Sequence, residues 1–586
     1  MKIATLILAS CISGLCNTHP AAPNNPIHHI SIENAEKPST TTQAPTPIYA
    51  GKYLASRFAQ QHHDWNHAYK FLSPIIEANK DQDELQRRAM VLAMGAGDYK
   101  SALQLARDVN GKSSNDQDIL ANLFLVAESF KTADYKEVYQ ILDSMPDNHT
   151  ARFIGPFVKA WTAAAQNKLS IGELQDSTLK LYHAILISDY LDDYSEIKKT
   201  LVNAQKVEDI QPAEYVKIGD IYGHIGLKED AIKLYKKAQD IFAKEDFGKL
   251  QVKIIGKKIS DVQSGANKAL FEEIRNPKEG LSKAFYDIAN TLFSEGNDET
   301  AQIFAHIALY ITPENYDVTL LLADIAAKYE QYSQALTYYQ RVPKDHADYI
   351  PARHKMADML VEINNTNKAL NTLEQLAYAT KDVKTRIRIG DIYRRNEQYG
   401  LALDSYNKAA KEFGHDIPDE YWHIYYLRGM AHEQAKNWEN AEKDLQKALS
   451  YRPDHPYLLN YLGYAWADRG QNLDEALKMI RRAVELRPND GYIIDSLGWV
   501  EYRLGNYEAA IPSLEKAVEL LPYDPIINDH LGDAYWKVGR KLEARFQWER
   551  AINHSEDTEA IKLTQQKLET GLQENHKIAE AEQNAE

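Results

Sequence analysis

Aromatic, acidic and basic side chains share one face of a predicted helix near the C-terminus. Asp495, Trp499 and Tyr502 stand at i, i+4 and i+7, and Arg503 follows at the edge of that face. Aromatic rings beside carboxylates suit an extended protein segment that carries apolar and basic residues. Trp, Tyr and Arg also carry much of the binding energy at protein interfaces. The pattern therefore predicts a protein-binding surface.

The same register recurs in the two neighbouring predicted helices. The equivalent positions are Asn460 and Tyr464 upstream, and Asp529, Asp533, Trp536 and Lys537 downstream. In the alternative interpretation, Trp499 and Trp536 pack between helices, and the Asp residues are solvated or cap helices. The acidic lining differs from the Lys/Asn clamp that holds chaperone tails in eukaryotic co-chaperones, so that subtype is not predicted.

Neither metal binding nor catalysis has comparable support in the sequence. His63 and His67 have the i, i+4 spacing that can chelate a metal, but no Glu completes a metalloprotease motif, and a solvated helix turn is favoured. Nucleophile elbows, phosphate-binding loops and dinucleotide fingerprints are absent from the sequence. We predict no metal, no cofactor and no enzymatic activity. The alternative is a hydrolase or transferase without a recognisable motif within residues 100–280.

Composition favours a large helical body. The 586 residues are 44% hydrophobic and 26% charged, with 27 Gly and 36 Tyr, which is a folded composition poor in turn residues. A net charge of −16 without a basic block argues against a nucleic-acid partner. Both cysteines lie within the first sixteen residues, which excludes a disulfide scaffold or a cysteine-ligated zinc site in the body.

Small residues recur about every 34 residues and indicate paired helices. Gly498 is followed by Ala510 twelve residues later and by Ala517 seven residues after that. From Ala301 to Ala544, equivalent alanines are 33 to 39 residues apart. Small side chains let two helices cross closely, and stacked pairs bury a continuous core. The pattern resembles the tetratricopeptide repeat, so we predict an all-α superhelical solenoid of about 11 or more helix-turn-helix units.

The N-terminal residues predict export and a tether. Residues 1–16 have a basic start and an apolar stretch too short to span a membrane, which is typical of a signal peptide. Leu8-Ala9-Ser10-Cys11 resembles a bacterial lipobox, in which Cys11 is acylated, and Ile12 favours the outer membrane. The alternative is cleavage near Cys16 and a soluble periplasmic protein. Residues 17–50 are rich in Pro, Thr and Asn and predict an extended tether.

The repeat spacing divides the rest of the chain into four parts. They are an N-terminal array over 51–240, degenerate in its second half; a long helical insert over 241–280; a C-terminal array over 281–554; and a polar capping helix and tail over 555–586. A polar last helix is what the exposed end of a solenoid requires for solubility.

The C-terminal repeats are more distinctive than the repeat consensus. Three strings carry the resemblance: Leu458-Leu-Asn-Tyr-Leu-Gly-Tyr464, Asp490-Gly-Tyr-Ile-Ile-Asp-Ser-Leu-Gly-Trp499 and Ile527-Asn-Asp-His-Leu-Gly-Asp-Ala-Tyr-Trp-Lys-Val-Gly-Arg540. They resemble a family of long proteobacterial tetratricopeptide proteins, in its alphaproteobacterial form, which includes outer-membrane lipoproteins. One member partners a carboxyl-terminal processing serine protease and delivers cell-wall hydrolases to it.

This resemblance implies a non-enzymatic adaptor at the periplasmic face of the outer membrane, with proteins or peptides of the cell envelope as partners. It implies membrane contact only through an N-terminal lipid. The alternative role is assembly or secretion of outer-membrane or envelope components. An array with exposed faces can also pair with a second copy of itself.

Overall fold

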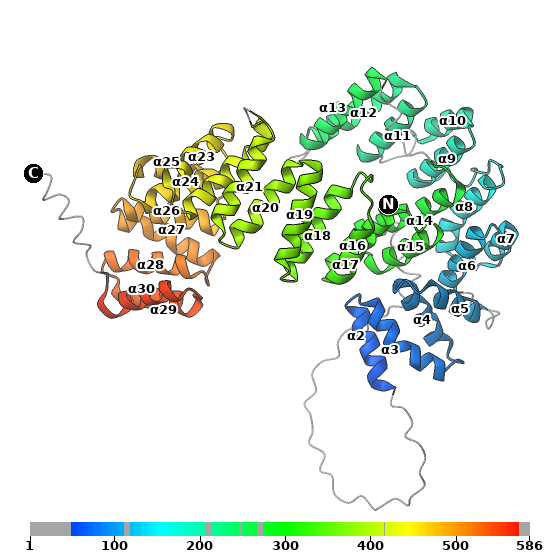
Figure 1. Ribbon diagram of the computed structural model, residues 1–586, viewed down its shortest axis with the longest axis horizontal. Coiled ribbons are helices and arrows are strands. Elements are labelled where there is room, and N and C mark those ends of the chain that lie inside the picture. Colours follow the sequence, from blue (N-terminus) through cyan, green and yellow to red (C-terminus); the bar gives the residue numbers. More distant parts are fainter. Residues whose placement is uncertain are drawn as a thin grey trace, which may run out of the picture. The chain divides into compact units, whose positions relative to one another are not determined.

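The computed structural model describes residues 49–110, 118–204, 212–244, 249–265, 274–414 and 417–572 (Figure 1). These ranges contain twenty-nine α-helices, one 3-10 turn and no strand, so the predicted all-α class is confirmed. None of their helices is long and apolar enough to cross a membrane. The predicted signal peptide, Cys11, nearly all of the tether and the tail after residue 572 lie outside the described residues.

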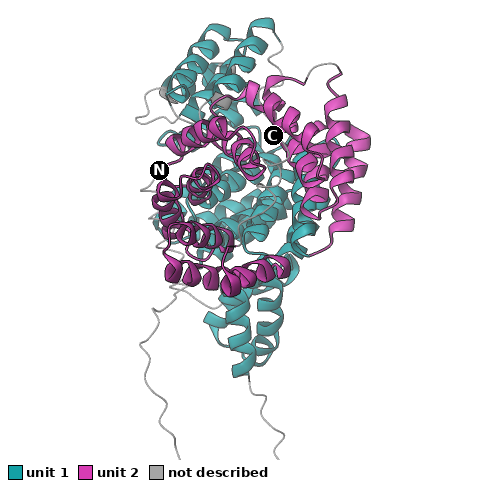
Figure 2. Cartoon of the chain, turned by 90° about the vertical axis from the view of Figure 1, so that its left-hand side faces the viewer, with its two compact units in different colours: residues 1–363 teal, residues 364–586 magenta. Residues whose placement is uncertain are grey.

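Two compact units make up the chain, residues 1–363 (unit 1) and 364–586 (unit 2) (Figure 2). The boundary falls inside the interval predicted as one C-terminal array. The helices of unit 1 are α2 (Ala50–Gln61), α3 (Trp65–Ala78), α4 (Asp83–Gly95), α5 (Tyr99–Asn110), α6 (Ile119–Lys131), α7 (Tyr135–Ser144), α8 (His149–Ala164), α9 (Thr178–Tyr190), α10 (Tyr194–Ala204), α11 (Pro212–His224), α12 (Lys228–Phe242), α13 (Lys249–Ser264), α14 (Pro277–Ser294), α15 (Asp298–Ile311), α16 (Tyr316–Lys328), α17 (Tyr332–Arg341) and α18 (Tyr349–Glu362).

Unit 2 continues the pattern of helix pairs. Its elements are α19 (Thr366–Thr380), α20 (Val383–Arg395), α21 (Tyr399–Lys411), η2 (Asp419–Tyr421), α22 (His423–Gln434), α23 (Trp438–Tyr451), α24 (Pro456–Asp468), α25 (Leu473–Leu486), α26 (Gly491–Arg503), α27 (Tyr507–Leu520), α28 (Pro525–Lys537), α29 (Lys541–His554) and α30 (Thr558–Thr570). Helices α20, α22, α24, α26 and α28 each pack against the helix that follows them, and we call these the first helices of their pairs.

Glycines sit where the two helices of a pair cross. Gly498 lies against Leu514, and Gly429 lies against Leu445, so closely that a Cβ atom on either glycine would overlap the leucine side chain. The large side chain of one helix fills the space left by the small residue of the other. The crossing role predicted for these small residues therefore matches the packing.

Helices α14 and α15 pack against α4, α6, α8 and α9, which come much earlier in the chain. Lys131 donates to the carbonyl oxygen of Tyr310 at 2.8 Å, and the Tyr99 hydroxyl lies 3.0 Å from Nδ1 of His306. Because of these extra contacts, α6 and α8 are buried on most sides. A helix buried all round loses the two-sided pattern of a surface helix, which explains the degenerate repeat spacing in this part of the sequence.

In the interval predicted as a helical insert, residues 241–280, the described residues form the end of α12, the 16-residue helix α13 and the start of α14. Helix α12 ends at Phe242, before α13, and α14 begins at Pro277, after α13. Helix α13 packs against α12, and its Lys258 pairs with Asp220 of α11 at 2.8 Å.

Candidate protein-binding site

The ten residues predicted to bind a partner all come from three first helices of unit 2. Asn460 and Tyr464 lie on α24, Asp495 to Arg503 on α26, and Asp529 to Lys537 on α28. Helix α24 contacts α26, and α26 contacts α28. We call the surface formed by α22, α24, α26 and α28 the first-helix face.

The Asp495 carboxylate contacts the next first helix. Asp495 is buried, and both of its oxygens lie 3.0 Å from Nδ1 of His530 on α28. Burial alone would lower the pKa of His530, but the nearby Asp495 outweighs burial and raises it. Asp495 is therefore part of a contact between repeats.

The two carboxylates of α28 are held by the capping helix α30. Lys567 lies 2.6 Å from Asp529 and 2.9 Å from Asp533, and the indole Nε1 of Trp548 donates to Asp533 at 2.9 Å. Burial raises the pKa of Asp533 to about 6. A lysine of the chain itself thus neutralises the acidic end of the first-helix face.

Contacts between an acidic residue of one helix and a basic residue at the next helix but one recur along both units. The partners are 31 to 38 residues apart: Asp220 with Lys258, Asp324 with Lys355, Glu433 with Arg469, Asp495 with His530, and Asp529 with Lys567. These acidic residues join one repeat to the next. The first-helix face consequently carries less free negative charge than the sequence indicates.

The remaining predicted residues at the edge of the face differ in exposure. Trp536 packs on Trp548, with ring centres 5.3 Å apart, and Gly571 lies directly against its ring. Arg503 donates to the carbonyl oxygen of Asp468 at 2.7 Å, whereas Lys537 is exposed. Trp536 is therefore half-buried and packs against the capped end.

Tyr464, Trp499 and Tyr502 are half-buried on this face. Trp499 stacks on Tyr502 at 5.0 Å and on His530 at 4.0 Å between ring centres. Within the described residues, neither the indole Nε1 of Trp499 nor Oδ1 of Asn460 has a hydrogen-bond partner. Both atoms are buried, and buried polar atoms without a partner are unusual in folded proteins.

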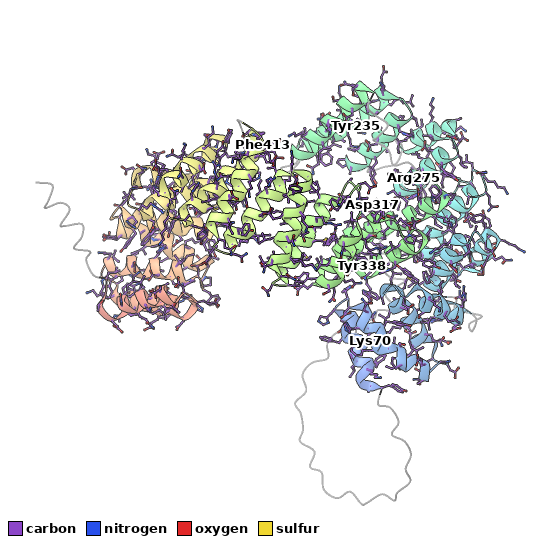
Figure 3. The ribbon with its side chains drawn as sticks, in the orientation of Figure 1. Lys70, Tyr235, Arg275, Asp317, Tyr338 and Phe413 are labelled. Atoms are coloured by element: carbon purple, nitrogen blue, oxygen red, sulfur yellow. The ribbon has the colours of Figure 1, made fainter. Side chains whose placement is uncertain are left out.

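Seven of the repeats belong to one of two kinds, a distinction that the sequence analysis missed. In one kind, an Asp directly after the small crossing residue accepts a hydrogen bond from an aromatic ring 15 residues later: Asp220 from Tyr235 (labelled in Figure 3), Asp324 from Tyr339, Asp391 from Tyr406, and Asp533 from Trp548. The signal is readable as a Gly-Asp or Ala-Asp dipeptide with an aromatic residue at a fixed distance.

In the other kind, a large side chain replaces that Asp. Helices α22, α24 and α26 carry Met430, Tyr464 and Trp499 at this position, and all three are half-buried. We call these three residues the large-residue row. Their repeats have an aliphatic side chain against the crossing glycine, as with Leu514 against Gly498, so the row does not bond to the second helix as the Asp residues do.

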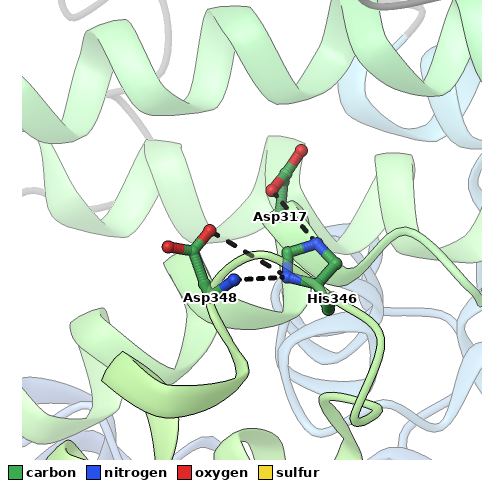
Figure 4. Close-up of side chains that lie close together, drawn as sticks. All are labelled: Asp317, His346 and Asp348. Atoms are coloured by element: carbon green, nitrogen blue, oxygen red, sulfur yellow. Dashed lines mark hydrogen bonds and ion pairs between the residues drawn. The ribbon is translucent and has the colours of Figure 1, made fainter. Parts of the chain in front are cut away.

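The two histidines considered for metal, His63 and His67, have separate contacts. His63 stacks on Tyr329 with ring centres 3.5 Å apart, whereas Nδ1 of His67 lies 2.7 Å from Asp64. One cluster in the described ranges, Asp317, His346 and Asp348, has three potential ligands (Figure 4). There, Nδ1 of His346 accepts the backbone N–H of Asp348 at 3.1 Å, which leaves the proton of the neutral ring on Nε2.

Sequence comparison identifies the repeats. Family models described as tetratricopeptide repeat match residues 387–449, 426–491 and 496–557, and a further one matches residues 215–245. The fold is a tetratricopeptide-repeat solenoid. The predicted fold class is thereby confirmed, and repeats of this type indicate a scaffold for protein–protein interaction. Nothing in these matches points to catalysis.

Three individual proteins show partial similarity to this chain. Over 127 residues the chain is 28% identical to anaphase-promoting complex subunit 3 of Schizosaccharomyces pombe, a match that covers 22% of this chain and only 19% of that protein. The APC/C Cut9–Hcn1 hetero-tetramer has a chain that is 15% identical, with 89% of this chain and 97% of that chain covered and a TM-score of 0.37. YrrB, a tetratricopeptide protein with an unusual peptide-binding site, is 20% identical, with 33% and 97% covered and a TM-score of 0.26.

Proposed function

We propose that this solenoid is a non-enzymatic adaptor of the bacterial cell envelope that docks partner proteins on the first-helix face of unit 2. The observation that carries the proposal is the large-residue row. Three consecutive repeats present Met430, Tyr464 and Trp499 where four other repeats hold an internally bonded Asp. Half-buried aromatic side chains such as Tyr464 and Trp499 are typical anchors of a protein interface.

The proposed partner is a carboxyl-terminal processing protease together with its substrates. The resemblance of the C-terminal strings to the proteobacterial lipoprotein family supports this partner. The signal-like start and the string ending at Cys11 support export and a lipid anchor at the periplasmic face of the outer membrane. A tether of about 34 residues would raise the local concentration of the adaptor near the membrane.

Partner capture tests the docking surface. The tagged full chain is crosslinked in envelopes and purified beside a Tyr464→Ala/Trp499→Ala variant. Tyr492→Ala is the matched control, because Tyr492 is an aromatic residue on α26 that is 59% exposed and outside the row. Trp536 is left unchanged because it packs on Trp548. We expect the protease to co-purify with the wild type and the control but not with the double variant. The melting temperature of the double variant should equal that of the wild type.

Two other outcomes would change the proposal. Recovery of envelope-assembly factors without a protease would replace the proposed partner but keep the adaptor role. Equal recovery of the partner by the wild type and the double variant would remove the large-residue row from the docking surface.

Acylation of Cys11 is tested separately. Cells that express the wild type or Cys11→Ser are labelled with a palmitate analogue and then fractionated. We expect label and outer-membrane fractionation only with the wild type. A labelled Cys11→Ser variant, or an unlabelled wild type in the soluble periplasm, would contradict the proposed anchor.

A further inference from the structure

A second candidate surface lies within unit 1. Helices α14, α16 and α18 line a groove of about 250 Å³. Its apolar wall includes Phe293, Leu320 and Pro351, and its acidic residues are Asp317, Asp324 and Asp348. One water occupies about 30 Å³ of liquid, so the groove has room for one or two side chains and not for a folded domain.

The acidic residues of the groove are not equally neutralised. Asp324 pairs with Lys355 at 2.6 Å and also accepts the hydroxyl of Tyr339. Among the described residues, Asp317 and Asp348 have no Lys or Arg within ion-pair distance, and each lies only near His346, at 3.8 and 4.0 Å. Their side chains are 40% and 52% exposed. One end of the groove therefore carries uncompensated negative charge.

We propose that this groove binds an extended protein segment in which a Lys or Arg stands next to an apolar side chain. The cationic group lies between Asp317 and Asp348, where two carboxylates attract it and hydrogen-bond to it. The apolar side chain lies on Phe293 and Leu320, where it leaves water. The inference rests on the proposed role in binding proteins, but it concerns a different unit and different residues.

A metal ion fits the same three residues less well. The backbone N–H of Asp348 donates to Nδ1 of His346, so Nε2 of the neutral ring carries a proton and has no lone pair for a metal. A guanidinium or ammonium group needs only the two carboxylates and leaves this hydrogen bond in place. The groove also continues onto apolar side chains, which suits a peptide.

A peptide screen tests the groove with the full chain. The probe is a positional-scanning library of nine-residue peptides, panned against the wild type and against Asp317→Asn/Asp348→Asn. The matched control is Asp345→Asn, because Asp345 is exposed in the same loop and does not line the groove. We expect the wild type and the control to select Lys or Arg beside an apolar residue. We expect the double variant to bind the selected peptide at least about tenfold more weakly, or about 1.4 kcal/mol.

Several results would overturn this inference. In one, the wild type selects peptides that contain no basic residue. In another, the wild type and the double variant select the same peptides although their melting temperatures are equal. A third is stoichiometric Zn²⁺ binding that His346→Gln removes, because it would assign the cluster to a metal. The proposed function is tested with the Tyr464→Ala/Trp499→Ala variant, whose substitutions lie in unit 2. The groove is tested with substitutions in unit 1. One proposal can therefore fail while the other stands.

Discussion

At the residue scale, the crossing glycines and the Asp residues that follow some of them fix how a helix pair closes. A Cβ atom at Gly390 would overlap the ring of Tyr406, whose hydroxyl is held by Asp391 at 2.7 Å. The ring is fully buried and cannot move aside. A methyl group at Gly390 must therefore force the two helices apart.

We predict that Gly390→Ala destabilises unit 2 by about 1–3 kcal/mol, the usual cost of overpacking a core. Gly400→Ala in the next helix is the control, because a Cβ atom there meets nothing within 4 Å. That variant should be neutral or gain up to about 1 kcal/mol, since Ala favours helix over Gly. The stability of both variants is measured by urea denaturation, with hydrogen exchange of the α20 and α21 amides as the readout. Equal stability of the two variants would contradict the packing argument.

Buried His306 makes the stability of unit 1 depend on pH. Burial lowers its pKa to about 3, whereas an unfolded histidine has a pKa of about 6.5. Below pH 6.5 the unfolded chain takes up a proton that the folded chain does not, so unit 1 loses stability as the pH falls from about 6.5 toward 3. The loss from this group is about 2 kcal/mol at pH 5.

His306→Gln should remove this part of the acid sensitivity, because glutamine does not titrate and can still hydrogen-bond to the Tyr99 hydroxyl. The measurement is the free energy of unfolding of unit 1 at pH 7.5 and at pH 5, from hydrogen exchange of α15 amides. The exposed His149→Gln variant is the control. An unchanged difference between the two pH values in His306→Gln would show that other groups cause the acid sensitivity.

At the element scale, helix pairs could be predicted from sequence because Gly and Ala at a fixed spacing record a local contact between neighbouring helices. Contacts to distant elements leave no such record. Helices α6 and α8 lose their repeat pattern because α14 and α15 also pack on them. For the same reason, the sequence overestimates the free negative charge of the predicted binding surface. Asp495 pairs with His530 of the next first helix, and Asp533 pairs with Lys567 of the cap.

The capping helix α30 illustrates how one such contact holds an element. Lys567 is the shared partner of Asp529 and of the buried Asp533. Its removal leaves a buried carboxylate without its cation, which costs about 1–3 kcal/mol. We predict that Lys567→Ala speeds hydrogen exchange throughout α30 and in the part of α28 that carries these two residues.

Lys562→Ala on the same helix is the matched control. Lys562 pairs with Glu559 at 2.6 Å, but the two side chains are 65% and 75% exposed. Exposed ion pairs contribute between about 0 and 1 kcal/mol, so exchange in α30 should change little. Similar exchange rates in the two variants would show that α30 is held by its apolar contacts and not by Lys567.

At the scale of the whole molecule, two compact units place two candidate surfaces on one chain. The large-residue row belongs to unit 2, and the acidic groove belongs to unit 1. A partner that offers segments for both surfaces would bind the intact chain more tightly than either unit alone, because the second contact becomes intramolecular. A partner that uses only one surface would gain nothing from the other unit.

We therefore predict that residues 364–586 alone capture the same envelope protease as the full chain, since this fragment contains α22, α24, α26, α28 and the cap α30. The fragment is first checked for helicity and cooperative unfolding, and it is then compared with the full chain by affinity measurement on the purified partner.

Equal affinity would assign docking to unit 2 alone. An affinity for the full chain that is about 10² to 10⁴ times higher would indicate a partner that binds both units, and the Asp317→Asn/Asp348→Asn change in the full chain should then remove that gain. A folded fragment that does not bind would contradict the large-residue row as the docking surface.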